Sequence, residues 1–417
     1  MLAHINNRLI YSFKFKRLHF VSQISRIVNY ICYGGDNVKS LRIYSFFSGA
    51  GFLDLGFEKE GFSIDFVNEY NEAFLEVYKY ARKNMNLQGP RYGYYCGDIN
   101  DLLKGKRKKE LLSYINADRK KEMIGFIGGP PCPDFSVAGK NEGINGDNGK
   151  LTNSYKRAIL LYEPDFFIFE NVKGLWSTKK HREEYNKIKQ AFSRKGYVFV
   201  DKLVNSLEYG VPQERERIIL FGVKYDLINK DKSLARKILR SNFSWGVNEK
   251  YSINTIKEIQ WPTTSKFVLD SVLKCPSNII EELTVEYWFR KNNVYNHNNS
   301  TDYFEPRSTT RFNTIQEGDV SKKSFKRLHR WRYSPTAAYG NNEVHLHPYK
   351  ARRLSVSEAL AIQSLPKEFI LPKTLSKSEM FKTIGNGVPY LMSKAIAHSI
   401  KAFLTSETGE DENVLHN

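Results

Sequence analysis

Six short apolar runs, separated by stretches long enough for helices, restrict the fold of this 417-residue chain more than any other feature. They lie between Arg42 and Val223 and read RIYSFF, SIDFVNE, EMIGFIGG, PDFFIFEN, YVFVDKLV and RIILFGV. Runs of this length are typical of buried strands, whereas segments 71–83 and 153–162 are long enough for helices. The alternation predicts an α/β protein with a doubly wound parallel sheet, whose ligands bind at the carboxyl ends of the strands.

The alternation fades after about Tyr225. Residues 226–350 are rich in Asn, Lys, Ser and Tyr and have no clear period, which predicts a smaller, irregular domain. Helical patterns return in residues 355–365 and 389–404. We therefore divide the chain into a basic extension without an assigned role (1–40), a ligand-binding domain (41–225), the irregular domain (226–350), a return to the first domain (351–405) and a tail (406–417).

The charge of the chain points to a polyanionic partner. Lysine and arginine outnumber the acidic residues by 64 to 45, which leaves a net charge of +19. Nucleic acid is the obvious partner, although a basic composition alone is also compatible with a protein that binds none. The four cysteines lie far apart, which favours a reducing compartment and argues against disulfides and a structural zinc site. No apolar run approaches the length of a membrane span.

The first candidate site is FFSGAGFLDLGF, which begins at Phe46. A strand, a glycine-rich turn and a helix form the usual cradle for a nucleotide-type cofactor, although such a turn often serves only packing. Glu69 and Asp98 follow the next expected strands, where carboxylates can accept hydrogen bonds from ribose and adenine. Each acid alone could be a helix cap. Together, and without a Walker lysine, they favour an adenosyl ligand that has no pyrophosphate.

The second candidate site is GGPPCPDFSVAGK, which contains Cys132. Most intracellular cysteines are small buried hydrophobes, but the surrounding prolines make a helix or a central strand unfavourable here. The segment follows an apolar strand and continues into a glycine-rich stretch that is typical of an active-site loop. A thiolate at this position would be a nucleophile.

Two further segments carry charged groups next to expected strands. Glu170 in FENV closes a buried apolar run, where an unpaired acid is costly, so it is a candidate proton donor. Arg215 and Arg217 alternate before a strand and should project to one face, where guanidinium groups suit carbonyl or phosphate recognition. The alternative for the arginines is a surface cluster with Glu214 and Glu216.

Taken in order, these segments resemble the cytosine-5 DNA methyltransferase family. The series FSGAG, NEYN, GDI, GGPPC, ENV, QERER, RRLSVSEALAIQSLP and GNGVP spans about residues 42–400. The resemblance implies a Rossmann-like fold that uses S-adenosylmethionine, together with a site-specific enzyme of a bacterial restriction–modification system. It also implies double-stranded DNA as the partner. We expect a monomer without a metal that acts in the bacterial cytoplasm and is nucleoid-associated when bound to DNA.

The resemblance also assigns residues. Glu69 would bind the ribose of the cofactor, and Asp98 would lie at its adenine. The full set expected at the cofactor is Phe47, Ser48, Gly49, Ala50, Gly51, Glu69, Tyr70, Asp98, Ile99, Pro131, Leu151, Asn386 and Val388.

The same resemblance assigns the catalytic groups. Cys132 would attack carbon 6 of a flipped cytosine, Glu170 would protonate nitrogen 3, and Arg217 would hold the 2-oxo group. Arg215 would support that arrangement, and Ser136 would contact the DNA backbone.

Two residues depart from the family pattern. Phe52 replaces the second glycine of a Gly-Gly pair and is expected to tighten the cofactor pocket. Pro133 stands where glutamine is usual after the nucleophile, which puts a backbone donor there in doubt. Neither residue is a catalytic side chain, so we expect an active enzyme.

In this family the irregular domain is the target recognition domain. Here it contains a basic segment interleaved with Phe325, Trp331 and Tyr333. Basic side chains neutralise phosphates and arginine reads guanine, although a solvated charged surface is the alternative. The residues expected to contact DNA are Lys326, Arg327, Arg330 and Arg332.

Two other functions remain open at this point. The same chemistry could act on RNA, although the Cys-Phe-Thr signature of the tRNA-modifying branch is absent from the sequence. A catalytically silent DNA-binding module is the second, and the intact set Cys132, Glu170 and Arg217 argues against it.

Overall fold

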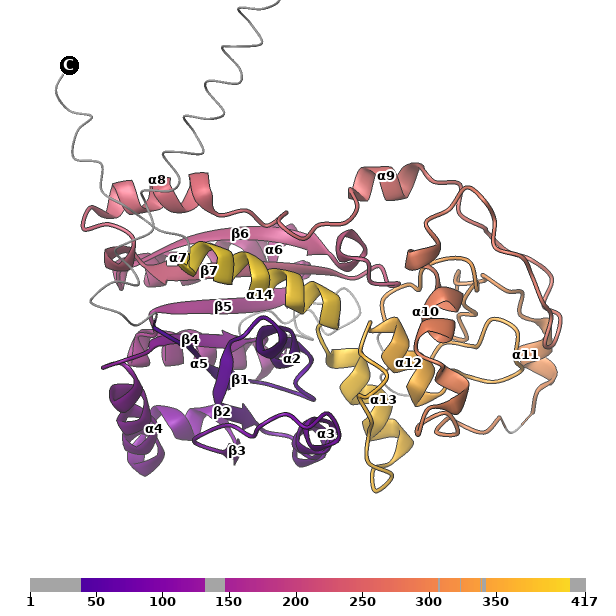
Figure 1. The fold of residues 1–417 in the computed structure, drawn as a ribbon, viewed down its shortest axis with the longest axis horizontal. Coiled ribbons are helices and arrows are strands. Elements are labelled where there is room, and N and C mark those ends of the chain that lie inside the picture. Colours follow the sequence, from indigo (N-terminus) through magenta and orange to yellow (C-terminus); the bar gives the residue numbers. More distant parts are fainter. Residues whose placement is uncertain are drawn as a thin grey trace, which may run out of the picture.

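The computed structural model describes residues 39–131, 147–306, 308–322, 324–337, 339 and 343–405. A single sheet with the strand order β3-β2-β1-β4-β5-β7-β6 forms the centre of the larger lobe (Figure 1). Its strands are β1 Leu41–Phe46, β2 Ser63–Glu69, β3 Tyr94–Cys96, β4 Met123–Gly128, β5 Phe166–Val172, β6 Tyr197–Asn205 and β7 Glu216–Lys224.

Strand β7 differs in direction from the expected parallel sheet. β1 pairs in parallel with β2 and β4, and β4 pairs in parallel with β5. β7 lies between β5 and β6 and is antiparallel to both. The connection from β6 to β7, residues 206–215, contains only the short helix η4 (Ser206–Tyr209). A crossover that returns a strand in parallel usually needs a dozen or more residues, so the shorter link reverses β7 and makes the sheet mixed.

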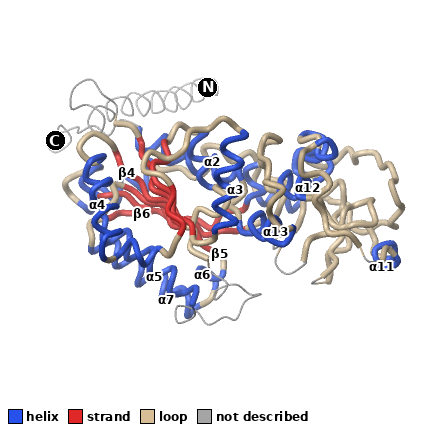
Figure 2. The backbone as a smooth tube through the Cα atoms, turned by 90° about the horizontal axis from the view of Figure 1, so that it is seen from below, coloured by secondary structure: helices blue, strands red, loops and turns tan. Residues whose placement is uncertain are grey.

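Helices cover both faces of this sheet, as the alternation predicts (Figure 2). The α/β fold of the sequence analysis is therefore confirmed. One face packs against α2 (Phe52–Lys59), α3 (Glu72–Asn84), α8 (Lys232–Asn242) and α14 (Tyr390–Thr405). The other packs against α4 (Gly105–Asp118), α5 (Asp147–Tyr162) and α7 (Lys179–Arg194).

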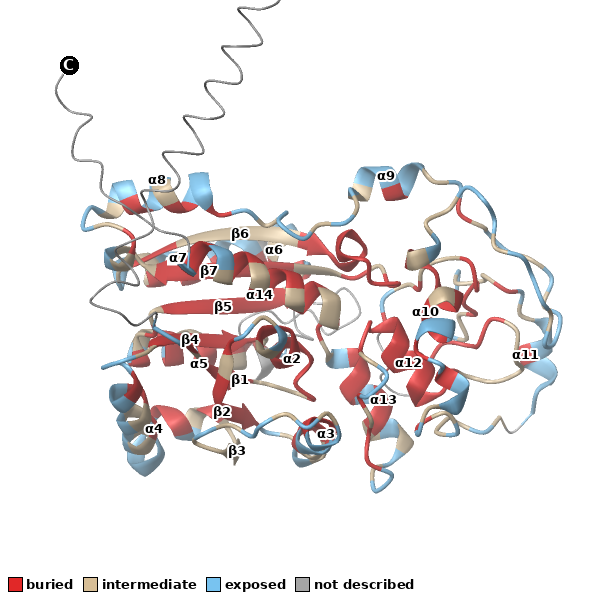
Figure 3. Ribbon diagram, in the orientation of Figure 1, coloured by how far each residue is buried: buried red, intermediate tan, exposed pale blue. Residues whose placement is uncertain are grey.

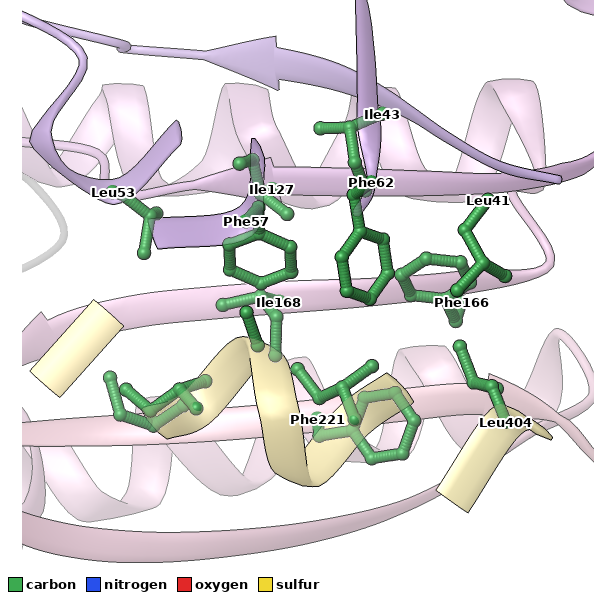
Figure 4. Packing of buried hydrophobic residues seen from close by; sticks show 14 of the residues in the cluster. Leu41, Ile43, Leu53, Phe57, Phe62, Ile127, Phe166, Ile168, Phe221 and Leu404 are labelled. Carbon is green, nitrogen blue, oxygen red and sulfur yellow. The ribbon is translucent and has the colours of Figure 1, made fainter. Parts of the chain in front are cut away.

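The core between the sheet and α14 is built largely from aromatic and branched side chains. Phe57 of α2, Ile168 of β5 and Phe221 of β7 are buried in one cluster (Figure 4). Leu404 of α14 belongs to the same cluster, so the last helix completes the core that the first strand begins. Burying each such side chain contributes about 1.5–3 kcal/mol, which explains why the predicted closing helix returns to the sheet.

A smaller lobe beside the sheet contains short helices and long connections (Figure 3). Its helices are α9 Ile253–Glu258, α10 Val285–Lys291, α11 Thr310–Thr314, α12 Val356–Ile362 and α13 Lys377–Asn386. Helices α10, α12 and α13 share one hydrophobic cluster with Phe52 and Leu55 of α2. The remaining short helices of the described chain are α6 Gly174–Ser177, η1 Ile99–Leu103, η5 Tyr225–Leu227, η6 Glu281–Leu283 and η7 Val294–Asn296.

The packing of α8 differs from the domain boundary expected at residue 226. Ala235 and Leu239 of α8 are buried in the cluster that covers the sheet, so this helix packs with the larger lobe. In the opposite sense, α12 and α13 pack with α10, and of the C-terminal helices only α14 reaches the sheet. Apolar contacts rather than chain order decide which lobe each helix joins.

None of the helices in the described ranges combines the length and the apolar composition needed to cross a bilayer.

Candidate active site

The carboxyl edge of the sheet collects most of the predicted cofactor residues. The segment Phe47 to Gly51 follows β1, and Glu69 ends β2 with the exposed Tyr70 beside it. The others are Asp98 and Ile99 after β3, Pro131 after β4, Leu151 on α5, Asn386 at the end of α13, and Val388. Because parallel strands end at the same edge, residues far apart in sequence meet here.

The turn after β1 is shaped to receive a ligand. Phe47 and Gly49 both have left-handed backbone conformations, with φ angles of 53° and 55°. A non-glycine residue in this region is strained and is common at ligand sites. A side chain at Gly49 would point into open space, and the buried Ser48 hydroxyl has no hydrogen-bond partner in the described structure. These features suit a cofactor that approaches the backbone closely.

Glu69 holds this turn from the neighbouring strand. Its Oε2 accepts a hydrogen bond from the Gly49 N–H at 2.8 Å, and its Oε1 accepts one from the Asn71 N–H at 2.8 Å. Burial raises the pKa of Glu69, and the backbone hydrogen bonds from Asn71 and Gly49 oppose this rise. Each carboxylate oxygen has further acceptor capacity, so the two together can receive a pair of hydroxyl groups.

Asp98 lies at the third strand end as the N-cap of η1. Its Oδ1 accepts hydrogen bonds from the Asn100 backbone N–H at 2.8 Å and from the Asn100 side chain at 2.9 Å. The Ser154 hydroxyl of α5 in turn donates to Asn100 Oδ1 at 2.8 Å. The capping role that the sequence left open is therefore real, and it orients the carboxylate at the site.

Phe52, which replaces a glycine of the family pattern, joins two distant motifs. Its ring packs edge-to-face on Phe369 with centroids 5.2 Å apart. A Cβ on Gly387 would lie only 2.1 Å from Phe52 Cδ2, so the GNGVP turn can approach the ring only because residue 387 is glycine. Phe52 thus connects the first cofactor motif to GNGVP.

Glu170 and Arg217 form an ion pair where β5 and β7 meet. Arg217 Nε lies 2.9 Å from Glu170 Oε1, and both side chains are largely buried. Burial lowers the pKa of Arg217, and Glu170 opposes that shift. A Cβ on Gly129 would lie 2.4 Å from Glu170 Oε2, so the chain after β4 passes directly over the carboxylate.

Sequence reasoning treated Gly129 only as part of GGPPC. The position of this glycine next to FENV depends on the pairing of β4 with β5, in which Gly128 lies opposite Phe169. The doubled glycine before the prolines was the available signal.

Two predicted residues, the nucleophile Cys132 and the DNA contact Ser136, lie outside the described residues, as does Pro133. Pro131, which precedes Cys132, is exposed after β4. Gly129 lies next to the Glu170 carboxylate in space, and the chain continues from Gly129 through Pro131 to Cys132, which carries the predicted nucleophilic thiol.

Arg215 faces a different set of partners from Arg217. Its guanidinium donates to the backbone carbonyls of Ala337 at 3.2 Å, Gly385 at 3.1 Å and Asn386 at 3.5 Å. Burial strongly lowers the pKa of Arg215, the neighbouring Arg217 adds to this effect, and Glu170 opposes it. Arg215 therefore lies near the ion pair and joins it to the GNGVP turn and to the smaller lobe.

A buried cluster behind the cofactor turn was not found from the sequence. Arg82 of α3 donates to the Gly51 carbonyl at 3.4 Å and to Glu58 at 2.7 Å, and it stacks over the Tyr78 ring at 3.5 Å. Tyr78 donates to Asp54 at 2.8 Å. The i to i+4 spacing of Tyr78 and Arg82 on the apolar face of α3 was the signal that indicated such a pair.

Two of the predicted DNA contacts are buried inside the smaller lobe. Arg327 is fully buried and donates to the backbone carbonyls of Ile315 and Lys350, both at 2.9 Å. Arg330 pairs with the buried Glu317 at 2.8 Å. These guanidinium groups satisfy an irregular backbone that has few regular hydrogen bonds. The structure thus corrects the expectation that Arg327 and Arg330 contact DNA, whereas Lys326 and Arg332 are partly exposed.

Replacing Arg330 by alanine is expected to lower the free energy of unfolding by about 3–5 kcal/mol, because Glu317 would stay buried without its partner. Arg332→Ala is the matched control and should cost less than about 1 kcal/mol, since its side chain is partly exposed. Urea unfolding followed by circular dichroism measures both. Equal stability of Arg330→Ala and the unmodified protein would contradict the internal role.

Comparison with known proteins supports the family that the sequence motifs indicate. Residues 41–402 match the family model for C-5 cytosine-specific DNA methylase. Type II methyltransferase M.NmeDI of Neisseria meningitidis serogroup C is 54% identical over 368 residues, 88% of this chain and 84% of that protein. Type II methyltransferase M.FnuDI of Fusobacterium nucleatum is 30% identical over 378 residues, 88% of this chain and 96% of that protein.

Solved structures agree at the level of the fold. The methyltransferase EhMeth of Entamoeba histolytica superposes with a TM-score of 0.54 at 14% identity, covering 89% of this chain and all of that one (100%). Together with the match over residues 41–402, these findings show that the chain belongs to the C-5 cytosine-specific DNA methylase family and is a DNA cytosine-5 methyltransferase.

Proposed function

We propose that Cys132, Glu170 and Arg217 carry out the methylation of a flipped cytosine in double-stranded DNA, with S-adenosylmethionine bound at the turn after β1. The observation that carries the proposal is the Glu170–Arg217 ion pair, which lies at the same sheet edge as the Gly49 turn and Glu69. Bound S-adenosylmethionine supplies an electrophilic methyl group. The residues that would hold it are Phe47 to Gly51, Glu69, Tyr70, Asp98, Ile99, Pro131, Leu151, Asn386 and Val388.

Carbon 5 of cytosine is a poor nucleophile until the ring is activated. Addition of the Cys132 thiolate to carbon 6, with a proton delivered to nitrogen 3 by Glu170, makes carbon 5 electron-rich. After carbon 5 has gained the methyl group, a base takes up the carbon 5 proton, the Cys132 thiolate leaves carbon 6, and the nitrogen 3 proton returns to Glu170, which restores the aromatic ring. These steps need an extrahelical base, because the stacked duplex shields both ring faces.

The geometry of the ion pair supports separate tasks for the two groups. Glu170 Oε1 faces Arg217 Nε, and Arg217 Nη1 donates to the Glu216 carbonyl at 2.8 Å. Glu170 Oε2 and Arg217 Nη2 are then the atoms that would meet nitrogen 3 and the 2-oxo group. A charge-assisted pair of this kind holds both groups in one orientation before the base arrives.

The test of this function is label transfer from S-[methyl-³H]adenosylmethionine. We expect incorporation into unmethylated duplex DNA at carbon 5 of cytosine and none into tRNA. Label that appears in tRNA and not in DNA of diverse sequence would favour the RNA alternative and overturn the proposal. Absence of label from both substrates would favour a silent DNA-binding module.

The names of the relatives support a proposal about the biological setting. We propose that the enzyme protects DNA in a bacterial restriction–modification system, as the Type II names of its relatives suggest. It would act as a monomer in the cytoplasm, on the nucleoid. Ser136, Lys326 and Arg332 are the DNA contacts that we retain, and Lys326→Ala should weaken binding to every DNA sequence.

Glu69 makes cofactor binding depend on pH. Its raised pKa means that the carboxylate takes up a proton at a higher pH than an ordinary glutamate does, and a protonated acid loses one acceptor for ribose. Affinity for S-adenosylhomocysteine should therefore fall as the pH is lowered, with a midpoint above that of an ordinary glutamate. Glu69→Gln should bind about tenfold more weakly and lose this dependence.

Isothermal titration calorimetry at several pH values measures both effects. Glu72→Gln, which changes an exposed acid in the first turn of α3, is the control and should keep the original profile. A Glu69→Gln protein with unchanged affinity and pH profile would remove Glu69 from the cofactor site.

A further inference from the structure

Two buried glutamines connect the smaller lobe to the cofactor side of the sheet. Gln213 precedes β7 and Gln363 follows α12, and each is 0% exposed. Gln213 Nε2 donates to Gln363 Oε1 at 3.2 Å. The sequence did not indicate a role for either residue. Each is an uncharged polar residue in a motif whose charged or apolar residues carry the recognisable pattern.

The outer ends of this pair reach two different parts of the molecule. The Ala337 N–H donates to Gln213 Oε1 at 2.9 Å, and Gln363 Nε2 donates to the Ile384 carbonyl at 2.7 Å. Hydrogen bonds therefore run in one direction from Ala337 through both side chains to Ile384. Since every amide oxygen accepts and every amide nitrogen donates, turning either amide around would place like groups against each other.

The Ala337 end belongs to a segment of the recognition domain that is held against the catalytic domain. The Ser334 N–H donates to the Pro212 carbonyl at 2.9 Å, and the Glu214 N–H donates to the Ser334 carbonyl at 2.8 Å. The Thr336 hydroxyl donates to the Glu214 carbonyl at 2.6 Å. Segment 334–337 thus lies along residues 212–214 as a short pairing between the two lobes.

The Ile384 end belongs to the cofactor site. Ile384 precedes Gly385 and Asn386, and the following Gly387 packs on Phe52. Arg215 makes a second link between the same two ends, because it donates to both the Ala337 and the Gly385 carbonyls. Segment 334–337 and the GNGVP turn are therefore linked twice, through the glutamine pair and through Arg215.

Because the two amides are buried, breaking this link is energetically costly, so the link can couple the positions of its two ends. A buried amide that loses its partner costs about 1–3 kcal/mol, so a shift of segment 334–337 cannot leave the Ile384 carbonyl unaffected. Apolar side chains of similar size would hold the lobes together without setting this register. The glutamine pair instead requires a donor at Ala337 and an acceptor at Ile384, which sets the position of both segments.

We propose that Gln213 and Gln363 are positioning residues that couple DNA engagement at the recognition domain to the affinity of the cofactor site. This inference rests on the proposed function of both lobes. When DNA contacts the recognition domain and holds segment 334–337 in place, the glutamine pair holds the turn at Gly385 and Asn386 in the conformation that binds the cofactor. By thermodynamic linkage, the cofactor strengthens DNA binding by the same factor.

The experiment compares the Kd of S-adenosylhomocysteine in the absence and presence of saturating DNA. The DNA is sheared genomic DNA from a strain without cytosine methylation, which is first shown to accept label from the unmodified enzyme. We expect DNA to tighten binding by at least about fivefold in the unmodified protein. In Gln363→Leu and Gln213→Leu this ratio should fall to within about twofold of one.

Asn299→Leu is the matched control. Asn299 is also fully buried and exchanges hydrogen bonds of 2.9 and 3.0 Å with the Leu371 backbone rather than with residues 384–387. Its loss should lower stability by a similar amount and leave the ratio unchanged. If Gln363→Leu does not fold, Gln363→Glu keeps the acceptor for Gln213, removes the donor to Ile384 and should lower the ratio as well.

The outcomes separate this inference from the proposed function. DNA that accepts no label overturns the function, and with it the inference. DNA that accepts label while both glutamine variants retain the original ratio overturns the inference alone. The same holds if Asn299→Leu lowers the ratio as much as Gln363→Leu, or if the unmodified enzyme shows no tightening.

Discussion

Cys132→Ser is expected to lower the rate of methyl transfer by about 1,000-fold or more, whereas the variant should still bind DNA. The reacting species is a thiolate, and a serine hydroxyl is far harder to ionise near neutral pH. Without addition at carbon 6, carbon 5 of cytosine stays too electron-poor to take a methyl group. Label transfer measures the rate, and electrophoretic mobility on duplex DNA measures binding.

A covalent trap assigns the nucleophile directly. In DNA that contains 5-fluorocytosine at the target position, carbon 5 carries fluorine, which cannot leave as a proton. The enzyme should therefore stay covalently bound to carbon 6, and the complex should survive on a denaturing gel. This complex should disappear in Cys132→Ser. It should persist in Cys96→Ser, which changes an exposed cysteine at the end of β3. A complex that survives in Cys132→Ser would move the nucleophile to another residue.

Glu170→Gln is expected to lower the rate of methyl transfer by about 10²–10⁴-fold. Glutamine has nearly the same shape as glutamate, but it cannot deliver a proton to nitrogen 3. It also leaves the buried Arg217 without its charged partner at 2.9 Å. Single-turnover measurements with saturating cofactor isolate this step from product release.

The control for Glu170→Gln is Glu163→Gln, which also removes a carboxylate from an ion pair. Glu163 pairs with Lys224 at 2.8 Å near the start of β5, away from the site. It should change the rate by less than about twofold. A Glu170→Gln enzyme with nearly full single-turnover activity would exclude Glu170 as the proton donor.

Most of the catalytic domain could be predicted because its signals are local. The segment 71–83 predicted a helix, and α3 runs Glu72–Asn84 with Asn71 as its N-cap. Glu69 is the last residue of β2, and FENV closes β5, which ends at Val172, as expected. An apolar run between polar turns specifies a strand, and a strand in a doubly wound sheet carries its last residues to the ligand edge.

The recognition domain could not be predicted in the same way. Arg330 and Arg332 look equivalent in the sequence, yet Arg330 is paired with Glu317 inside the lobe and Arg332 is partly exposed. In a region without regular hydrogen bonding, buried arginines satisfy backbone carbonyls, as Arg327 does. Which arginine takes that task depends on partners far along the chain.

By itself, the sequence determined the order of the strands along the chain, the chemical groups at their ends and the family to which these belong. The tertiary structure decided the reversal of β7, the contact of Phe52 with Gly387, the internal use of Arg327 and Arg330, and the link through Gln213 and Gln363. The physical reason is one of range. Strand and turn preferences are set by neighbouring residues, whereas the pairing of a buried polar group is decided only when distant segments meet and each donor must find its acceptor.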